Sequence, residues 1–222
     1  MASEIMVVIM IETYIRAPYQ RILVYPIARG VRDRISPNQL TLLSGLSGFL
    51  ILPCMYFEAR VFAIILLLLS GFLDTLDGTL ARLTQHSSNW GSVLDITTDR
   101  LVEFIVILSL WMVAPETRSF GVIMMLGSVL LCITSFLVVG IFTTNDSEKG
   151  FYYSPGIMER AEAFVFFIAM IVWPAYFSVL AFLFSFLVLL TAVIRLKEFY
   201  KAQYAYLTSM TSKKDNRNWS HD

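Results

Sequence analysis

Four aspartates lie inside apolar stretches of the chain that otherwise resemble membrane-spanning helices. Asp74 and Asp77 fall within one stretch, and Asp95 and Asp99 fall within the next. A charged side chain at the depth of lipid hydrocarbon is costly, so its presence in a spanning segment favours a functional role. Four neighbouring carboxylates also repel one another, and bound divalent cations relieve that repulsion. The aspartates therefore predict a metal site inside a membrane protein.

The residues around the first pair predict what the site binds. Asp74 and Asp77 share one stripe of a 3.6-residue helix with Arg82. Gly78 and Ala81 lie on the same stripe and lack bulk, which leaves room for a ligand to approach the backbone. A guanidinium at Arg82 can form paired hydrogen bonds with phosphate oxygens. In outline this is a pocket for a nucleoside diphosphate.

The second pair forms a matching stripe that begins at Gly91. The short connection over residues 83–90 requires the two stretches to run antiparallel, so depths along them can be compared at a rise of 1.5 Å per residue. Asp74 and Asp99 each lie eight residues from the connection, roughly 12 Å along the helix axis. The other two aspartates pair in the same way nearer the connection. All four carboxylates are expected to converge.

The predicted ligands are hard oxygen atoms, because no His or Cys cluster with metal-site spacing accompanies the aspartates. Such ligands favour Mg²⁺, Mn²⁺ or Ca²⁺ over zinc or copper. A pair of metals held between carboxylates is also the usual arrangement for in-line displacement at phosphorus.

The composition is that of an integral membrane protein. Of 222 residues, 57% are apolar and 15% are charged, and the mean hydropathy is +0.68. The formal net charge is zero, so no basic field favours a nucleic-acid partner. The expected fold is an all-α, polytopic bundle of six transmembrane helices. The predicted spans cover residues 39–57, 61–82, 91–113, 120–143, 160–177 and 178–197.

The distribution of Lys and Arg predicts the orientation in the membrane. Nearly all of these residues flank the ends that would lie on the same side as both termini, whereas Arg60 and Arg118 lie on the other side. The positive-inside rule then predicts that both termini and the aspartates face the cytoplasm, at the inner membrane if the cell is bacterial.

Three segments are predicted. Residues 1–35 mix apolar and charged side chains and are expected to form an interfacial amphipathic segment, in which Pro18 and Pro26 interrupt any long helix. Residues 36–203 form the membrane domain, whose first helix starts at an N-cap serine followed by proline. Residues 204–222 are polar and without periodicity, so a disordered cytoplasmic tail is expected there.

The aspartates also belong to a longer pattern, D-x2-D-G-x2-A-R-x8-G-x3-D-x3-D, which resembles the signature of the CDP-alcohol phosphotransferase family. It runs from Asp74 to Asp99 with every spacing kept. Eight specified positions would coincide by chance on the order of once in ten billion windows. Residues 36–41, Ser-Pro-Asn-Gln-Leu-Thr, resemble the family's TPN-x-LT segment, with Ser in place of Thr. The resemblance covers about residues 35–200.

The resemblance implies an enzyme of phospholipid biosynthesis. In the family, the acceptor hydroxyl attacks the lipid-bearing phosphorus of a CDP donor such as CDP-diacylglycerol, and CMP leaves. By this likeness the four aspartates hold two Mg²⁺ or Mn²⁺ ions, and Asp99 is the expected catalytic base. The residues expected at the CDP donor are Asn38, Gly78, Ala81, Arg82 and Gly91. The partners implied are a small polar alcohol, the lipid bilayer and a second copy of the chain in a homodimer.

The acceptor alcohol is predicted from Arg160. An inward arginine near a metal site suits a phosphorylated acceptor such as inositol phosphate or glycerol phosphate. The Glu-Arg-Ala-Glu run over residues 159–162 resembles the inositol-phosphate branch of the family, although Ala163 stands where that branch often has a second arginine. The alternative is that Arg160 marks the inner end of a helix and pairs with Glu159 or Glu162.

Two further charged positions lie within or next to predicted spans. Glu103 lies one turn beyond Asp99 and fits either the site or an interhelical hydrogen bond. Arg195, together with Lys197 and Lys201, is expected to anchor the last span to anionic lipid headgroups.

The main alternative function is a divalent-cation transporter or channel that uses the aspartates as an ion path. Such a path needs polar groups towards the outer half of the membrane, whereas the outer ends of the second and third spans are apolar. A non-catalytic scaffold is disfavoured because four acids facing Arg82 and Arg100 leave excess buried negative charge.

Overall fold

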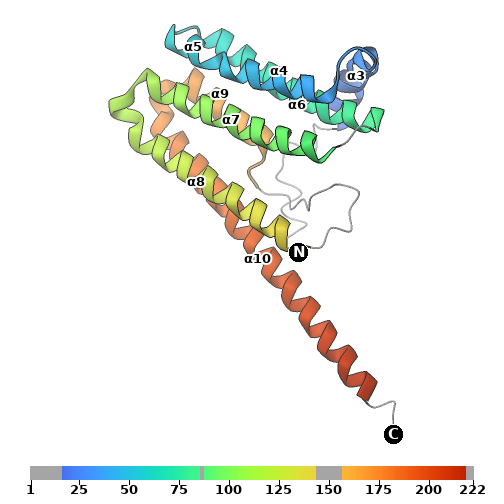
Figure 1. Cartoon of the computed structure of the whole chain (residues 1–222). Coiled ribbons are helices and arrows are strands. Elements are labelled where there is room, and N and C mark those ends of the chain that lie inside the picture. The colour runs from blue at the N-terminus through green and yellow to red at the C-terminus, as the bar shows by residue number, and fades with distance from the viewer. Residues whose placement is uncertain (1–16, 86–87, 144–156, 219–222) are drawn as a thin grey trace.

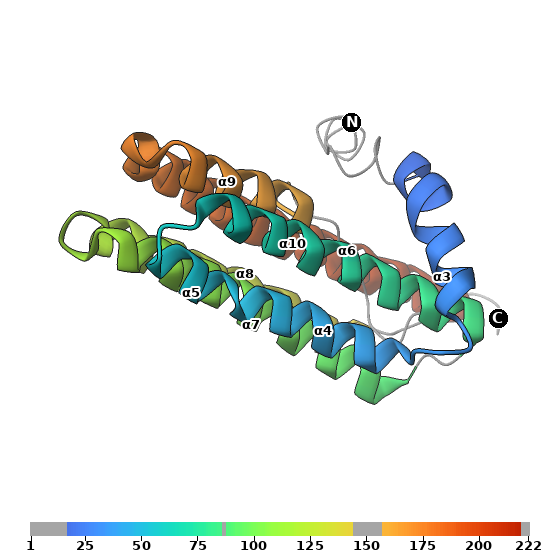
Figure 2. The same cartoon turned by 90° about the horizontal axis from the view of Figure 1, so that it is seen from above.

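The protein is all-α in the computed structural model, which describes residues 17–85, 88–143 and 157–218 (Figures 1 and 2). Residues 1–16 and 219–222 of the predicted terminal segments lie outside the described residues. The elements are a π-helical turn η1 (Gln20–Val24), α3 (Tyr25–Val31), α4 (Pro37–Phe49), α5 (Ile51–Tyr56), α6 (Arg60–Thr84), α7 (Asn89–Val113), α8 (Pro115–Phe142), α9 (Arg160–Val172), a 3₁₀ turn η2 (Pro174–Tyr176) and α10 (Phe177–Asn218).

Four segments of the described chain are long and apolar enough to cross a membrane: Pro37–Tyr56, Arg60–Thr84, Pro115–Phe142 and Pro174–Tyr204. The other two predicted spans do not meet this standard, for different reasons. Helix α7 has 25 residues but carries four charged side chains between Asp95 and Glu103. Helix α9 has 13 residues, so it extends roughly 20 Å, less than the ~30 Å of a bilayer core. The chain is polytopic, and length and composition do not confirm the count of six spans.

The first membrane segment begins as expected and then bends. Ser36 caps α4 in a capping box with Gln39, and Pro37 occupies the first turn of the helix. Helix α4 ends at Phe49, and α5 continues from Ile51. Pro53 explains the break, because it has no N–H to donate to the carbonyl oxygen of Phe49.

Helices α6 and α7 run antiparallel, as predicted, but α4 holds them in place (Figure 2). Helix α4 packs along both of them, whereas α6 and α7 have little direct contact with each other. The approach of α4 to α7 depends on glycine. A Cβ at Gly45 would lie 2.8 Å from Cγ2 of Thr98, and one at Gly48 would lie 2.5 Å from Cγ2 of Val102. Helix α4 therefore sets how far apart the two aspartate-bearing helices lie.

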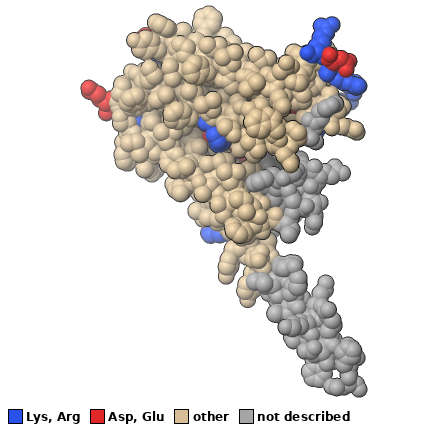
Figure 3. All heavy atoms as spheres, in the orientation of Figure 1, with Lys and Arg blue, Asp and Glu red and all other residues tan. Residues whose placement is uncertain are grey.

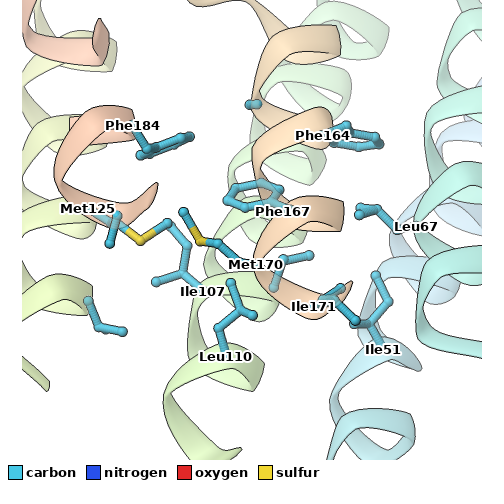
Figure 4. Close-up of a cluster of buried hydrophobic side chains, with 14 of the residues drawn as sticks. Ile51, Leu67, Ile107, Leu110, Met125, Phe164, Phe167, Met170, Ile171 and Phe184 are labelled. Atoms are coloured by element: carbon cyan, nitrogen blue, oxygen red, sulfur yellow. The ribbon is translucent and has the colours of Figure 1, made fainter. Parts of the chain in front are cut away.

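Helices α8 and α10 pack along each other, and α9 fits between this pair and α6 and α7 (Figure 1). The main apolar core lies where α9 meets its neighbours (Figure 4). Phe167 of α9 is fully buried there, with its ring centroid 5.5 Å from that of Phe184. The outer surfaces also carry large exposed apolar side chains, among them Phe62 and Phe182. Figure 3 shows a face that is mostly uncharged, as lipid contact requires.

The N-terminal segment differs from its prediction at Pro26. The prolines were expected to interrupt any long helix, yet the chain stays helical through η1 and into α3. The π-turn η1 precedes Pro26 and accommodates the hydrogen bond that the proline cannot donate. Val24 and Ala28 are fully buried against α6, whereas Ile22 is 75% exposed.

The predicted tail also differs, because α10 continues to Asn218 and includes most of residues 204–222. This stretch contains no proline or glycine to end the helix that enters it. Polarity and missing periodicity therefore did not predict the helix seen up to Asn218.

Candidate active site

Three of the four aspartates converge between α6 and α7. Carboxylate oxygens of Asp74, Asp95 and Asp99 all lie within 4.8 Å of one another. We refer to these three residues as the aspartate cluster. The depth comparison explains the contact, because Asp74 and Asp99 were expected at the same distance from the connection. A set of carboxylate oxygens with this spacing fits a hard divalent cation.

Asp77 is the fourth aspartate, and its carboxylate has a different partner. Thr41 of α4 donates a hydrogen bond from Oγ1 to Oδ2 of Asp77, with the two atoms 2.5 Å apart. Both residues are buried, with 5% of Asp77 and 4% of Thr41 exposed. The sequence predicted four converging carboxylates, and the structure brings three together while Asp77 is held beside them by α4.

Arg160 joins the aspartate cluster from α9. Its Nη1 atom makes ion pairs with Asp74 and Asp99, which lie on different helices. A capping box between Glu159 and Glu162 fixes the first turn of α9, and Arg160 is the first residue of that turn. Arg160 therefore faces the site, as one of the two sequence interpretations proposed.

A cavity of about 280 Å³ opens beside the cluster. Three arginines line it, Arg100, Arg160 and Arg195, and we call it the arginine cavity. Of the four aspartates, Asp99 is the one that lines this cavity, so it borders both the cluster and the cavity. Such a concentration of guanidinium groups suits an anion with several oxygens, such as a phosphate.

Glu103 also lines the arginine cavity and is buried. Its Oε2 atom lies 2.6 Å from Nη1 of Arg100, one turn earlier on α7. The sequence left Glu103 open between the site and a bond to another helix. The structure gives it a position in the cavity and a partner on its own helix.

The residues predicted to bind the CDP donor lie at one end of α4, α6 and α7. A Cβ at Gly78 would meet only Nη1 of Arg82, 3.7 Å away, so the surface beside Gly78 is open. Arg82 is exposed and donates from Nη2 to Oγ1 of Thr79 at 3.1 Å.

On α7, a Cβ at Gly91 would lie 3.3 Å from Oδ1 of Asn38, so the glycine permits a close approach of these two donor-site candidates. Ala81 is partly exposed on α6. The predicted donor residues thus form two groups. Gly78, Ala81 and Arg82 lie along α6, and Asn38 and Gly91 lie where α4 meets α7.

A model of the family described as CDP-alcohol phosphatidyltransferase matches residues 34–207. The match includes all four aspartates, Arg160 and Arg195. The chain belongs to the CDP-alcohol phosphatidyltransferase family. It is therefore a membrane-bound transferase of phospholipid biosynthesis, and this confirms the reaction class and the family predicted from the sequence.

Two curated relatives cover most of this transferase. Inner membrane protein YnjF of Escherichia coli is 30% identical over 151 residues, which are 65% of this chain and 73% of that protein. A phosphatidylinositol phosphate synthase of Corynebacterium glutamicum is 28% identical over 158 residues, 68% of each chain.

Solved structures of the Mycobacterium tuberculosis phosphatidylinositol phosphate synthase share the fold of this transferase. The one in complex with manganese and citrate superposes with a TM-score of 0.67 at 22% identity, and covers 80% of this chain and 89% of that one. The one with CDP-DAG bound has a TM-score of 0.61 at 24% identity, and covers 80% and 94% of the two chains.

Arg195 is a site residue that the sequence interpretation missed. It was expected to anchor the transferase to lipid headgroups, but it is 8% exposed and lines the arginine cavity. Its Nη1 atom donates to the carbonyl oxygen of Cys132 at 3.1 Å and to Oγ of Ser135 at 3.2 Å. Helical spacing could have predicted that Arg195 is buried, because Phe184 and Val188 precede it on the same buried face of α10.

Tyr19 also reaches the site, from the N-terminal segment outside the membrane domain. Burial and the negative charge of Asp74 hold the pKa of its phenol above the usual value. No spacing pattern in the sequence pointed to this contact, because it depends on how the N-terminal helix crosses α6.

Proposed function

We propose that this transferase moves the phosphatidyl group of CDP-diacylglycerol to a hydroxyl of a phosphorylated polyol, with inositol phosphate as the favoured acceptor. The observation that carries the proposal is the arginine cavity beside the aspartate cluster, with Asp99 part of both and Arg160 lining the cavity while pairing with Asp74 and Asp99. Arg100 pairs with Glu103, so Arg160 and Arg195 are the arginines that an acceptor phosphate would engage, and a neutral or cationic alcohol such as inositol or choline offers them no anion.

The donor assignment rests on the relatives and on the residues beside the aspartates. A solved relative binds CDP-DAG, and the open surface along Gly78 gives a nucleotide room to approach α6. In this proposal Asn38, Gly78, Ala81, Arg82 and Gly91 form the nucleotide side of the site. The lipid tails extend into the bilayer over the exposed apolar surface of the helices.

The oxygen-only ligands of the aspartate cluster fit Mg²⁺ or Mn²⁺, and a solved relative contains manganese. We assign Asp74, Asp77, Asp95 and Asp99 as the residues that hold two such ions. When bound, the ions neutralise the diphosphate and stabilise negative charge on the leaving CMP.

Asp99 is proposed as the catalytic base because it borders the arginine cavity. An acceptor whose phosphate binds Arg160 and Arg195 presents its hydroxyl to this carboxylate. Asp99 takes the hydroxyl proton, the hydroxyl oxygen bonds to the phosphatidyl phosphorus, and the bond from that phosphorus to CMP breaks. Arg160 fixes the position of the acceptor relative to the aspartates, because it lines the arginine cavity and pairs with Asp74 and Asp99.

The membrane arrangement completes the proposal. We infer six spans, in which α7 and the shorter α9, continued by η2, join the four apolar segments, with both termini and the site on the cytoplasmic face. The N-terminal segment lies at the interface, since its buried face packs on α6 and Ile22 faces outward. The homodimer stays a prediction.

The test is release of CMP from CDP-diacylglycerol by the purified protein with Mn²⁺ or Mg²⁺. Five acceptors are compared: inositol phosphate, glycerol phosphate, inositol, serine and choline. We expect inositol phosphate to give a kcat/KM at least about 100-fold above that of inositol, because an unphosphorylated acceptor leaves the buried arginines without their ligand.

The acceptor that reacts fastest decides which part of the proposal stands. A higher rate with glycerol phosphate keeps the phosphorylated class and replaces inositol phosphate as the acceptor. Equal or faster reaction with inositol, serine or choline removes the acceptor proposal. No CMP release with any acceptor removes the donor proposal.

A further inference from the structure

The side chain of Thr41 lies next to the proposed metal site but has no assigned role in the reaction. It is on α4, whereas the four aspartates are on α6 and α7. Its hydroxyl donates to Oδ2 of Asp77 at 2.5 Å, a length typical of a hydrogen bond to an ionised carboxylate. This hydrogen bond joins two helices. It connects Asp77, which lies outside the aspartate cluster, to α4, which sets the distance between α6 and α7.

The geometry points to Thr41 as a positioning residue for Asp77 in metal binding. The inference rests on the proposed function, which gives Asp77 a share of two divalent ions. Thr41 uses Oδ2 of Asp77 and so leaves Oδ1 as the oxygen able to turn towards the cluster. A ligand carboxylate held by a donor outside the coordination shell is a common feature of metal sites.

Competition for the hydroxyl proton supports the assignment. Oγ1 of Thr41 also lies 3.2 Å from the carbonyl oxygen of Pro37. One hydroxyl has one proton to donate, and the shorter bond to a carboxylate is the stronger of the two. A back-bond to Pro37 is the ordinary alternative for a threonine in a helix, so the approach to Asp77 is a specific feature of this position.

Burial makes the bond hard to replace. With 4% of Thr41 and 5% of Asp77 exposed, water has little access to Oδ2 if the hydroxyl is removed. The orientation of α4 is itself fixed at its start by the capping box of Ser36 and Gln39. It is fixed again further along by the close contact of Gly45 with α7. Thr41 therefore presents its hydroxyl from a rigid helix.

The chain offers a matched control three residues later. Ser44 lies on the same face of α4 and is 1% exposed. Its hydroxyl donates to the carbonyl oxygen of Ser70 on α6 at 2.9 Å. Ser44→Ala thus removes a buried α4–α6 hydrogen bond that does not involve an aspartate.

The experiment measures Mn²⁺ binding directly, from the electron paramagnetic resonance signal of free Mn²⁺ titrated into purified protein. Thr41→Val keeps the shape of the side chain and removes the donor, and we expect it to raise the Kd for Mn²⁺ about 10-fold or more. Thr41→Ser keeps the hydroxyl and should stay within about threefold of the wild-type Kd. Ser44→Ala should match the wild type.

Two additional measurements separate positioning from a structural role. In an Asp77→Asn background, Thr41→Val should change the Kd less than about twofold, because the two residues act as one unit. The Mn²⁺ concentration for half-maximal CMP release should rise in Thr41→Val, while the KM for the donor at saturating Mn²⁺ should not. If Thr41→Val does not fold, Thr41→Ala tests the same loss of the hydroxyl without bulk.

Equal Mn²⁺ affinity in wild type, Thr41→Val and Thr41→Ala overturns the inference, as does an equal loss in Ser44→Ala. These results leave the proposed function intact. Failure of the wild type itself to bind Mn²⁺ or Mg²⁺ removes the proposed metal site instead.

Discussion

The two halves of the helix bundle hold their buried charges for different purposes. The first half, at the N-terminal ends of α4, α7 and α9, contains the aspartate cluster, the arginine cavity and Asp77; we call it the charged half. The opposite half, at the turns from α5 to α6, α7 to α8 and α9 to α10, contains most of the apolar core; we call it the apolar half.

Arg118 shows how the apolar half handles a buried charge. It is 5% exposed, and its Nη1 atom donates to the carbonyl oxygen of Leu110 at 2.8 Å. Its guanidinium carbon lies 4.6 Å from the centroid of the Phe177 ring. The carbonyl belongs to the last turn of α7, where a cation is favourable. This arginine ties α7, α8 and α10 together and faces no cavity of the site.

The arginines of the charged half face a cavity and carboxylates instead. Arg160 and Arg195 line the same cavity, and Arg160 reaches two aspartates. Both also lie over phenylalanine rings, so what separates them from Arg118 is the cavity and not the aromatic contact. A buried charge therefore serves structure where it only joins helices, as at Arg118, and is placed for binding where a cavity lies beside it. Substitutions in the two halves should therefore separate activity from stability.

The largest effect is expected for Asp99→Asn in the charged half. Loss of the proposed base should lower kcat for CMP release about 1,000-fold. Stability should be unchanged or higher, because the substitution removes one of several neighbouring negative charges. CMP release and thermal unfolding of the same preparation check both parts.

The control for Asp99→Asn is Asp33→Asn, since the Asp33 side chain is 91% exposed. Its activity should equal that of the wild type. If Asp99→Asn keeps more than about a tenth of the wild-type kcat, the assignment of Asp99 as the base is wrong.

An intermediate effect is expected for Arg118→Met in the apolar half. The change removes the bond to the Leu110 carbonyl and the contact with the Phe177 ring, which should lower the free energy of unfolding by about 2 kcal/mol. The kcat of the folded protein should stay within about twofold. Chemical unfolding in mixed micelles measures the first quantity.

Arg60→Met provides the comparison, because Arg60 is exposed at the same end of the bundle. It should leave the free energy of unfolding nearly unchanged. A large loss of activity in Arg118→Met at temperatures where it stays folded would break the distinction between the halves.

The smallest effect comes from one substitution made in both halves, Gly45→Ala and Gly121→Ala. A Cβ at Gly45 would lie 2.8 Å from Thr98, the neighbour of Asp99, so α4 and α7 must separate slightly. We expect kcat to fall about fivefold through this displacement. A Cβ at Gly121 would lie 3.0 Å from the ring of Phe177. Gly121→Ala should cost about 1 kcal/mol of stability and leave kcat unchanged.

Measuring kcat and the free energy of unfolding for both Gly→Ala variants tests whether the half that contains the glycine decides which of the two quantities changes. The comparison fails if both variants lose activity equally.

The sequence predicted the part of the site that follows from helix periodicity. Asp74 and Asp99 lie together because equal counts from a short connection give equal depths on antiparallel helices. The start of α4 at Ser36 and Pro37 followed from local capping rules, which need no tertiary information. The family signature added the reaction class.

Tertiary contacts determined the rest. Asp77 pairs with Thr41 because α4 lies against α6, and nothing in either segment alone states that neighbour. Arg195 lies near several lysines, so its charge suggested lipid headgroups, whereas its helical face decided its burial. The π-turn before Pro26 replaced the expected break because packing against α6 kept the segment helical.

The central claim is that the arginine cavity binds the phosphate of the acceptor. Isothermal titration of inositol phosphate into the wild type, Arg195→Gln and Lys197→Gln tests it most directly. Arg195 lines the cavity from α10 and donates to Cys132 and Ser135, and Lys197 is exposed two residues away. We expect the Kd for inositol phosphate to rise at least about 10-fold in Arg195→Gln and to stay unchanged in Lys197→Gln. Equal affinity in the wild type and Arg195→Gln would contradict the claim.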